Sequence, residues 1–315
     1  NCAMGVTAVI PDMDPTRPAE VDPGKILEAA RDWQATQSFG SPAIWNRVGR
    51  YCEANGASLP TLRRVLSAGA PVPVHVLRRM KACIHPAGDI HTPYGATEAL
   101  PVASIAASEV LAETAAKTDQ GAGVCVGRRF SGIQWQVIRA VDGPIPGIGD
   151  AQILPEGEIG ELIVAGPVVT RRYVTRVEAN ATGKIADGAR LWHRMGDAGY
   201  LDDQDRFWFC GRIAHRVRTA AGTKYTIPCE AIFNRHEAVS RSALVGVGEP
   251  GRQRPVILLE PLRGKGPRTE EERRRFFEEI RELAASSPLT ADIDTFLIHP
   301  SFPVDIRHNV KIFRE

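Results

Sequence analysis

The chain has 315 residues, a formal net charge of +2 and 43% hydrophobic residues. That length is enough for two or three units with cores of their own. The balanced charge gives no reason to expect nucleic acid as a partner. Nowhere does the chain contain the roughly eighteen consecutive apolar residues of a transmembrane helix.

The cysteines indicate the redox compartment of the protein, and the first residues indicate how the chain relates to its gene product. The cysteines are scattered and form no C-x-x-C pair, a pattern typical of reduced thiols in a cytoplasmic protein. The chain begins Asn1-Cys2-Ala3-Met4, which is neither an initiator methionine nor a signal peptide. We therefore expect a C-terminal portion of a longer gene product.

Residues 1–120 alternate short apolar runs with helical patterns. A buried strand is predicted at 62–67, and it is followed by Gly69-Ala70-Pro71 and a helix with apolar Val74 and Leu77 on one face. Strand, tight turn and helix form the unit of an open α/β sheet. In such sheets ligands bind beyond the carboxyl ends of the strands.

The next two regions differ in pattern. Residues 121–212 are rich in glycine and short β-type runs, which predicts a small β-barrel or a distorted antiparallel sheet. Residues 213–315 predict a compact α+β domain. Its expected elements include a helix from Pro228 to Ala238 and a helix over 269–286 with a capping box of Thr269 and Glu272.

A first group of candidate site residues lies in the run 91–98, where we expect a loop to leave a sheet. Tyr94 offers a flat ring, Gly95 flexibility, Thr97 a hydroxyl donor and Glu98 a carboxylate. A magnesium nucleotide needs such groups: a stacking face for the base, a donor to phosphate, and a hard oxygen for the metal.

Two further candidates complete the pattern. Asp197 is expected on a glycine-flanked turn about one strand ahead of Arg212, and its carboxylate could accept hydrogen bonds from both hydroxyls of a ribose. Lys311, near the end of the chain, offers a positive charge that a small domain could carry into a site. Taken singly, each of these residues also fits an ordinary structural role. Their order along the chain favours a shared site.

With these motifs in sequence order, the chain resembles the adenylate-forming enzymes, the superfamily of acyl-CoA synthetases, luciferases and peptide-synthetase adenylation domains. The resemblance covers essentially all 315 residues. It implies an α/β large domain with a parallel sheet over 1–120 and a β-barrel subdomain over 121–212. It also implies a small mobile α+β domain over 213–315.

The resemblance implies ATP and Mg²⁺ as cofactors and assigns roles by motif. Gly69, Ala70 and Pro71 match the loop that lines the adenine pocket, and Tyr94, with Gly95 beside it, matches the aromatic that stacks on adenine.

The same resemblance implies which residues contact the phosphate, the magnesium ion, the ribose and the substrate. Thr97 matches the hydroxyl on the α-phosphate, and Glu98 matches the magnesium ligand. Asp197 matches the ribose-binding acid and Arg212 the arginine at the domain junction. Lys311 matches the lysine that reaches the substrate carboxylate during adenylation.

Three stretches narrow the resemblance to the β-lactone synthetases of bacterial olefin biosynthesis: 7–18, 92–105 and 304–315. This implies that a long-chain 2-alkyl-3-hydroxyalkanoic acid is activated as acyl-AMP, and that its own 3-hydroxyl then displaces AMP. It also implies a cytoplasmic assembly with a thiolase-like condensing enzyme, a ketoreductase and a β-lactone decarboxylase.

Two departures from the superfamily pattern keep alternatives open. Ala214 stands where an aspartate or lysine is usual at the domain hinge, which argues against thioester formation. The glycine- and threonine-rich phosphate loop does not occur in the chain. A fatty acyl-CoA ligase therefore remains the second hypothesis, and a non-catalytic adenylate-binding fragment remains the third.

Overall fold

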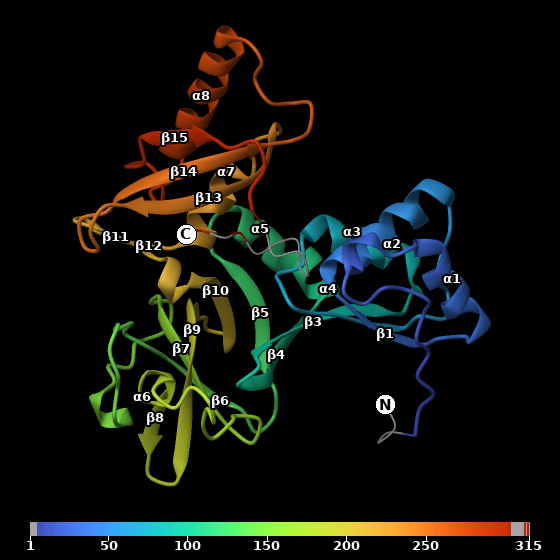
Figure 1. Ribbon diagram of the computed structural model, residues 1–315, viewed down its shortest axis with the longest axis horizontal. Helices are drawn as coiled ribbons and strands as arrows, with labels where there is room; N and C mark the ends of the chain where they lie inside the picture. Colours follow the sequence, from blue (N-terminus) through green and yellow to red (C-terminus); the bar gives the residue numbers. More distant parts are fainter. Residues whose placement is uncertain (1–4, 304–311, 313, 315) are drawn as a thin grey trace. The chain divides into compact units, whose positions relative to one another are not determined.

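The computed structural model describes residues 5–303, 312 and 314, which fall into two compact units (Figure 1). The first unit contains residues 5–94, 104–113 and 312. The second contains residues 95–103, 114–303 and 314.

The first unit is built on parallel strands with helices against them. Strand β1 (Gln37–Gly40) pairs in parallel with β2 (Arg64–Ser67), and β2 pairs in parallel with β3 (Asp89–Ala96). The parallel α/β sheet expected here is confirmed. The other elements of this part of the chain are η2 (Pro18–Glu20), α1 (Pro23–Asp32), α2 (Pro42–Asn55), α3 (Val74–Cys83), α4 (Ala107–Glu109) and η3 (Val110–Thr114).

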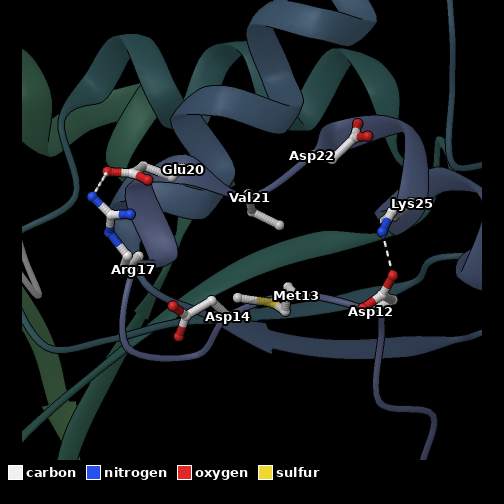
Figure 2. A pocket seen from close by; sticks show the side chains of 8 residues that line it. All are labelled: Asp12, Met13, Asp14, Arg17, Glu20, Val21, Asp22 and Lys25. Carbon is white, nitrogen blue, oxygen red and sulfur yellow. Dashed lines mark hydrogen bonds and ion pairs between the residues drawn. The ribbon is translucent and has the colours of Figure 1, made fainter.

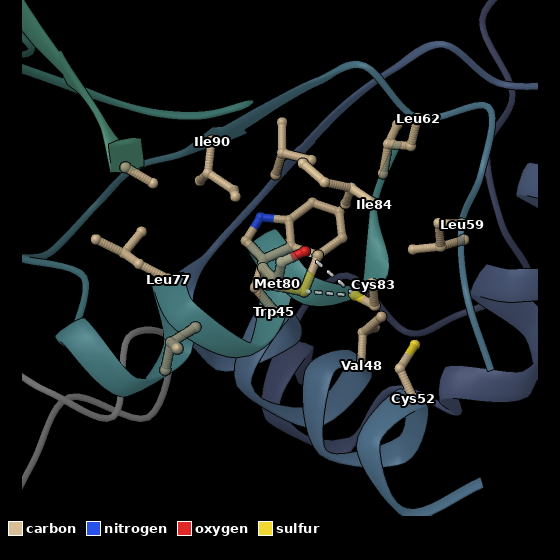
Figure 3. Close-up of a cluster of buried hydrophobic side chains, with 13 residues drawn as sticks. Trp45, Val48, Cys52, Leu59, Leu62, Leu77, Met80, Cys83, Ile84 and Ile90 are labelled. Carbon is tan, nitrogen blue, oxygen red and sulfur yellow. Dashed lines mark hydrogen bonds between the residues drawn. The ribbon is translucent and has the colours of Figure 1, made fainter. Parts of the chain in front are cut away.

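The core of the first unit lies between α2, α3 and the strands (Figure 3). Trp45 of α2 and Met80 of α3 are almost completely buried, together with Val65 of β2 and Ile90 of β3. Burial of a large apolar side chain stabilises a fold by about 1.5–3 kcal/mol. This core therefore holds the two helices against the sheet whose strand ends carry part of the predicted site.

The second unit begins with an antiparallel sheet, as the pattern of 121–212 indicates. Its strands run in the order β5, β10, β9, β7, β6, and β8 pairs with the outer part of β9. The elements from this stretch are β4 (Ala99–Ala106), α5 (Ala115–Asp119), β5 (Val124–Arg129), β6 (Gln134–Ile138), η4 (Ile148–Asp150), β7 (Gly160–Ala165), α6 (Ala179–Gly183), β8 (Lys184–Asp187), β9 (Arg190–Leu201) and β10 (Arg206–Arg212).

The remaining elements of the second unit include a three-stranded sheet with two helices, and a two-stranded sheet of β11 and β12. Strand β14 lies between antiparallel β13 and parallel β15, and α8 buries Phe276 and Ile280 in their shared core. The elements are η5 (Ile213–His215), β11 (Val217–Thr219), β12 (Gly222–Lys224), α7 (Thr226–Phe233), β13 (Val239–Val247), β14 (Arg254–Pro261), α8 (Glu270–Ala285) and β15 (Thr295–Ile298).

Two helix predictions for this region have different outcomes. The capping box is present, because Thr269 Oγ1 accepts from Glu272 N and the Glu272 carboxylate accepts from Thr269 N. The helix expected from Pro228 to Ala238 is too long: α7 ends at Phe233. A tight turn follows it, in which Val239 N donates to His236 O, and this turn redirects the chain into β13.

Asp142 links a loop of the antiparallel sheet to the residues after β10. Its two carboxylate oxygens accept from Arg216 at 2.6 Å and from Arg218 at 2.7 Å. The guanidinium of Arg216 lowers the pKa of Asp142, so the acid is charged near neutral pH. The short turn η5, which contains Ala214, lies between Arg212 and these two arginines.

Among the described residues, no helix is both long and apolar enough to cross a bilayer. The described cysteines are free thiols, as expected: Cys52, Cys83, Cys125, Cys210 and Cys229. Cys2 lies outside the described residues.

Candidate nucleotide site

Thr97 and Glu98 form the two-residue turn between β3 and β4. The loop expected over 91–98 is therefore wrong for most of its length, since β3 extends through Ala96. Gly95 is required just before this turn, because a Cβ atom there would lie 2.6 Å from the carbonyl oxygen of Ala99. The tight turn places a hydroxyl and a carboxylate next to each other at the end of two strands.

Two residues from a distant segment hold Glu98. The Tyr173 hydroxyl donates to Glu98 Oε1 at 2.7 Å, and Thr170 N donates to the Glu98 carbonyl oxygen at 2.8 Å. Burial is the largest single influence on Glu98 and opposes its ionisation. The hydrogen bond from Tyr173, a backbone hydrogen bond and the nearby positive charge of Lys184 act together against burial, so the pKa of Glu98 is lowered. Glu98 is therefore an anion with a neutral hydrogen-bond donor.

Lys184 and His193 lie close enough to this carboxylate to interact with its charge. Lys184 Nζ donates to the Thr170 carbonyl oxygen at 2.5 Å, and burial lowers the pKa of this lysine. His193 is almost completely buried, and its Nδ1 lies 2.9 Å from the Gly183 carbonyl oxygen. Burial and the charge of Lys184 lower the pKa of His193 to about 4. His193 is therefore neutral at physiological pH.

The second acid, Asp197, lies on a strand. The glycine-flanked turn expected for it is wrong, because Asp197 sits within β9 and pairs directly with Arg212 of β10. Gly196 has a φ of +65°, and this left-handed residue explains why the local sequence looks like a turn. Asp197 Oδ1 accepts from Arg212 Nη1 at 2.6 Å, with the carboxylate almost buried and the guanidinium about half exposed.

Some predicted residues belong to the first unit. Gly69, Ala70 and Pro71 follow the carboxyl end of β2, and Tyr94 lies toward the end of β3, the strand that pairs with β2. Because β2 and β3 are parallel neighbours, the loop 69–71 and Tyr94 both lie toward the carboxyl ends of these two strands. Lys311 lies outside the described residues.

Sequence patterns did not reveal Tyr173 or Lys184 as part of the site. Tyr173 contacts Glu98 across 75 positions of sequence, and it stands in a run of arginines and valines that has no periodic pattern. No local signal could have identified that contact. The spacing of Lys184 before His193 on paired strands β8 and β9 was a usable clue, because these two residues are register partners.

The first unit has a surface hollow whose lining residues all fall between Asp12 and Lys25 (Figure 2). Acidic and basic side chains line it, among them Asp12 paired with Lys25 and Arg17 paired with Glu20. None of the predicted site residues lines it. In the described part of the chain, no group of three or more histidine, cysteine or acidic residues is arranged to hold a metal. A metal at Glu98 would therefore need ligands from a bound substrate.

Comparison with known proteins identifies relatives along nearly the whole chain. The chain is 46% identical to an olefin β-lactone synthetase of Stenotrophomonas maltophilia and 46% identical to one of Xanthomonas campestris. Each match covers 99% of this chain and 56% of the relative. The chain thus spans a little over half the length of these curated relatives.

A solved structure shares the fold. The o-succinylbenzoate–CoA synthetase of Bacillus subtilis, in complex with ATP and magnesium, has a TM-score of 0.69 to this chain at 17% identity, covering 93% of this chain and 54% of that one. The α/β fold of an adenylate-forming enzyme is thereby confirmed. The family model described as AMP-binding enzyme matches residues 2–174, more than half of the chain. The chain belongs to the AMP-binding enzyme family.

Proposed function

We propose that the protein containing this chain is an ATP-dependent β-lactone synthetase. It activates a long-chain 2-alkyl-3-hydroxyalkanoic acid as an acyl-AMP and closes that intermediate to a β-lactone. The observation that carries the proposal is the 46% identity to olefin β-lactone synthetases over 99% of the chain. Two carboxylates also support it. Glu98 accepts from the neutral hydroxyl of Tyr173 and so keeps its charge for a metal, whereas Asp197 is paired with Arg212 and suits the uncharged hydroxyls of a ribose.

The motifs of the chain supply the nucleotide contacts that we propose. Gly69, Ala70 and Pro71 line the adenine, Tyr94 stacks on it, and Asp197 accepts hydrogen bonds from the ribose hydroxyls. Arg212 fixes the Asp197 carboxylate through its 2.6 Å ion pair.

Residues at the turn act on the phosphates. Thr97 donates its hydroxyl to the α-phosphate, and Gly95 allows the close turn that brings Thr97 and Glu98 together.

The residues present fit a magnesium ion. Mg²⁺ in nucleotide sites is usually held by one or two carboxylates together with substrate phosphates, and Glu98 is an ionised, hard oxygen donor whose partner Tyr173 is neutral. Glu98 would hold the ion. When bound, the ion offsets negative charge that develops on the phosphoryl oxygens.

In the first step the substrate carboxylate attacks the α-phosphorus, a new O–P bond forms and pyrophosphate leaves. Lys311, carried by the mobile domain over 213–315, contributes positive charge to the same phosphoryl group. The product is a mixed anhydride with AMP as an excellent leaving group.

In the second step the 3-hydroxyl oxygen attacks the acyl carbon. The bond from that carbon to the phosphate oxygen breaks, AMP leaves and the hydroxyl proton is released. Because nucleophile and electrophile belong to one molecule, closure has an effective-concentration advantage that reaches about 7–11 kcal/mol in well-oriented systems. Ala214, in place of a charged hinge residue, supports a second step that needs no thioester-forming orientation.

The direct test incubates the full-length protein with ATP, Mg²⁺ and a long-chain 2-alkyl-3-hydroxy acid, without CoA. We expect β-lactone, AMP and pyrophosphate in equal amounts by mass spectrometry and a coupled pyrophosphate assay. A matched acid that lacks the 3-hydroxyl should stop at acyl-AMP. If product forms only after CoA is added, and is a thioester, the protein is a fatty acyl-CoA ligase and the proposal is wrong.

The cellular context follows from the same proposal. The free thiols of the described cysteines support a reducing compartment such as the cytoplasm. The chemistry of the substrate calls for a condensing enzyme and a ketoreductase before this step, and for a β-lactone decarboxylase after it. We propose that the protein assembles with these enzymes.

A further inference from the structure

Glu98 is supported by residues 169–184, which lie between β7 and β9 and end at the first residue of β8. No motif of the sequence includes this segment. Its main chain contacts the turn in two places: Thr170 N donates to the Glu98 carbonyl oxygen, and Val169 forms an isolated bridge with Ala99. One side chain of the segment, Tyr173, reaches the Glu98 carboxylate itself.

The position of Tyr173 is fixed independently of Glu98. The Asn180 side chain accepts from Tyr173 N at 2.7 Å and donates to the Tyr173 carbonyl oxygen at 3.1 Å. Gly183 lies beside the ring, where a Cβ atom would be in ordinary van der Waals contact, 3.4 Å from Tyr173 Cε2. Because Asn180 holds its main chain on both sides, Tyr173 presents its hydroxyl from a defined point.

The donor to the Glu98 carboxylate is a neutral phenol, not a cation. A phenol donates a hydrogen bond without neutralising the carboxylate, whereas an ammonium group would form an ion pair. The nearby ammonium, Lys184, donates instead to Thr170, at the carbonyl oxygen and at Oγ1, and lies 5.8 Å from the centre of the Tyr173 ring. Burial and the adjacent Glu98 raise the pKa of Tyr173 to about 12, so the phenol keeps its proton.

We propose that Tyr173 is a positioning residue for metal binding: its hydroxyl holds Glu98 Oε1 and thereby directs Oε2 toward the cation of the bound nucleotide. Asn180 holds Tyr173 in the required place. The inference rests on the proposed function, because it takes Glu98 as the ligand of a nucleotide-bound metal.

The test measures metal binding apart from turnover. Mn²⁺ replaces Mg²⁺ in a complex of the full-length protein with ATP, without acid substrate, and its affinity is measured by electron paramagnetic resonance. Tyr173→Phe removes one hydrogen bond to a charged group and should weaken Mn²⁺ binding about ten-fold. ATP affinity in the presence of a chelator should not change.

A double-variant cycle separates positioning from a general structural effect. In a Glu98→Gln background, Tyr173→Phe should cause no further loss of Mn²⁺ affinity, because the ligand that it positions is already gone. Asn180→Ala, which keeps the hydroxyl, should give a smaller loss than Tyr173→Phe. Tyr200→Phe is the matched control: the Tyr200 ring stacks on Trp208, and the variant should bind Mn²⁺ like the wild type.

Equal Mn²⁺ affinity in wild type and Tyr173→Phe overturns the inference, and so does an equal, additive loss in the Glu98→Gln background. In the complete assay we expect Tyr173→Phe to raise the KM for Mg²⁺ while kcat at saturating Mg²⁺ stays near that of the wild type. Failure of the proposed function looks different: the wild type would bind Mn²⁺ and ATP normally and form no lactone.

Discussion

Two carboxylates of the second unit are held in opposite ways: Glu98, half-buried at the β3–β4 turn, and Asp197, buried within β9. Glu98 accepts from the neutral hydroxyl of Tyr173. Asp197 accepts from the guanidinium of Arg212. A carboxylate with a neutral donor keeps its full charge for a cation, whereas a carboxylate in an ion pair is suited to hydrogen-bond uncharged hydroxyls.

The difference teaches that the identity of the acid does not determine its role. The roles that we propose follow from the nearest partner of each acid, and the two partners are supplied in different ways. Arg212 is the strand neighbour of Asp197, while Tyr173 comes from a segment 75 residues away. If the comparison is correct, substitutions at the two acids should separate metal dependence from nucleotide affinity.

The largest effect is expected for Glu98→Gln. Removing the proposed ligand of the charge-stabilising ion should slow acyl-adenylate formation about 10²- to 10³-fold, the size seen when one preorganised electrostatic contact is lost. Pyrophosphate release measured over a range of Mg²⁺ concentrations checks this. A rate that does not depend on the residue at 98 would remove Glu98 from the metal site.

Asp197→Asn should reduce the affinity for ATP about ten- to hundred-fold, because hydrogen bonds from ribose to a charged acceptor are weakened. Unlike the effect at Glu98, this loss should be the same with Mg²⁺ and with a chelator. Isothermal titration of the nucleotide measures it. A loss seen only with metal present would contradict the division between the two acids.

The glycines before the acids should respond differently as well. Gly95→Ala forces a Cβ atom against the Ala99 carbonyl oxygen and should lower the free energy of unfolding by about 1–3 kcal/mol. Gly196→Ala places an alanine at a φ of +65° and should cost about 1–2 kcal/mol. Denaturant unfolding measures both. Gly149→Ala, with no heavy atom within 4 Å of the added Cβ, is the control and should change little.

A pH-dependent effect is expected at His193. The pKa of His193 is about 4 in the fold and near 6.5 when unfolded, so below pH 6.5 the unfolded chain takes up a proton that the folded chain does not. Stability from the neutral histidine is complete above pH 6.5 and is lost as the pH falls toward 4. The free energy of unfolding should fall by about 1.4 kcal/mol per pH unit more in the wild type than in His193→Asn. Parallel curves for the two proteins would show that His193 is not buried in its neutral form.

Much of the fold was predictable because it depends on local patterns. The short β-type runs of 121–212 form an antiparallel sheet, and the spacing of Thr269 and Glu272 identifies the start of α8. The end of α7 was missed, because the turn after Phe233 depends on main-chain hydrogen bonds and not on a helix-breaking residue.

The site was predictable only in part, for the same physical reason. Motif order predicts Glu98 and Asp197 as site residues, a prediction that stays to be tested, but their contacts depend on how the strands pair. Gly196 looks like a turn residue in sequence, yet here its left-handed backbone lies inside a strand. Tyr173 was missed because its role exists only once residues 169–184 pack beside the β3–β4 turn.

The pairing of Asp142 with Arg216 and Arg218 has a consequence for the proposed motion of the last domain. Its carboxylate is 60% exposed, so dissolved ions screen both contacts together. Higher ionic strength should therefore weaken both ion pairs, which lie just after the proposed hinge at Ala214. Added salt should thereby speed the proposed domain movement without altering any residue that we propose for the nucleotide site. The solvent alone would then set the rate of that movement.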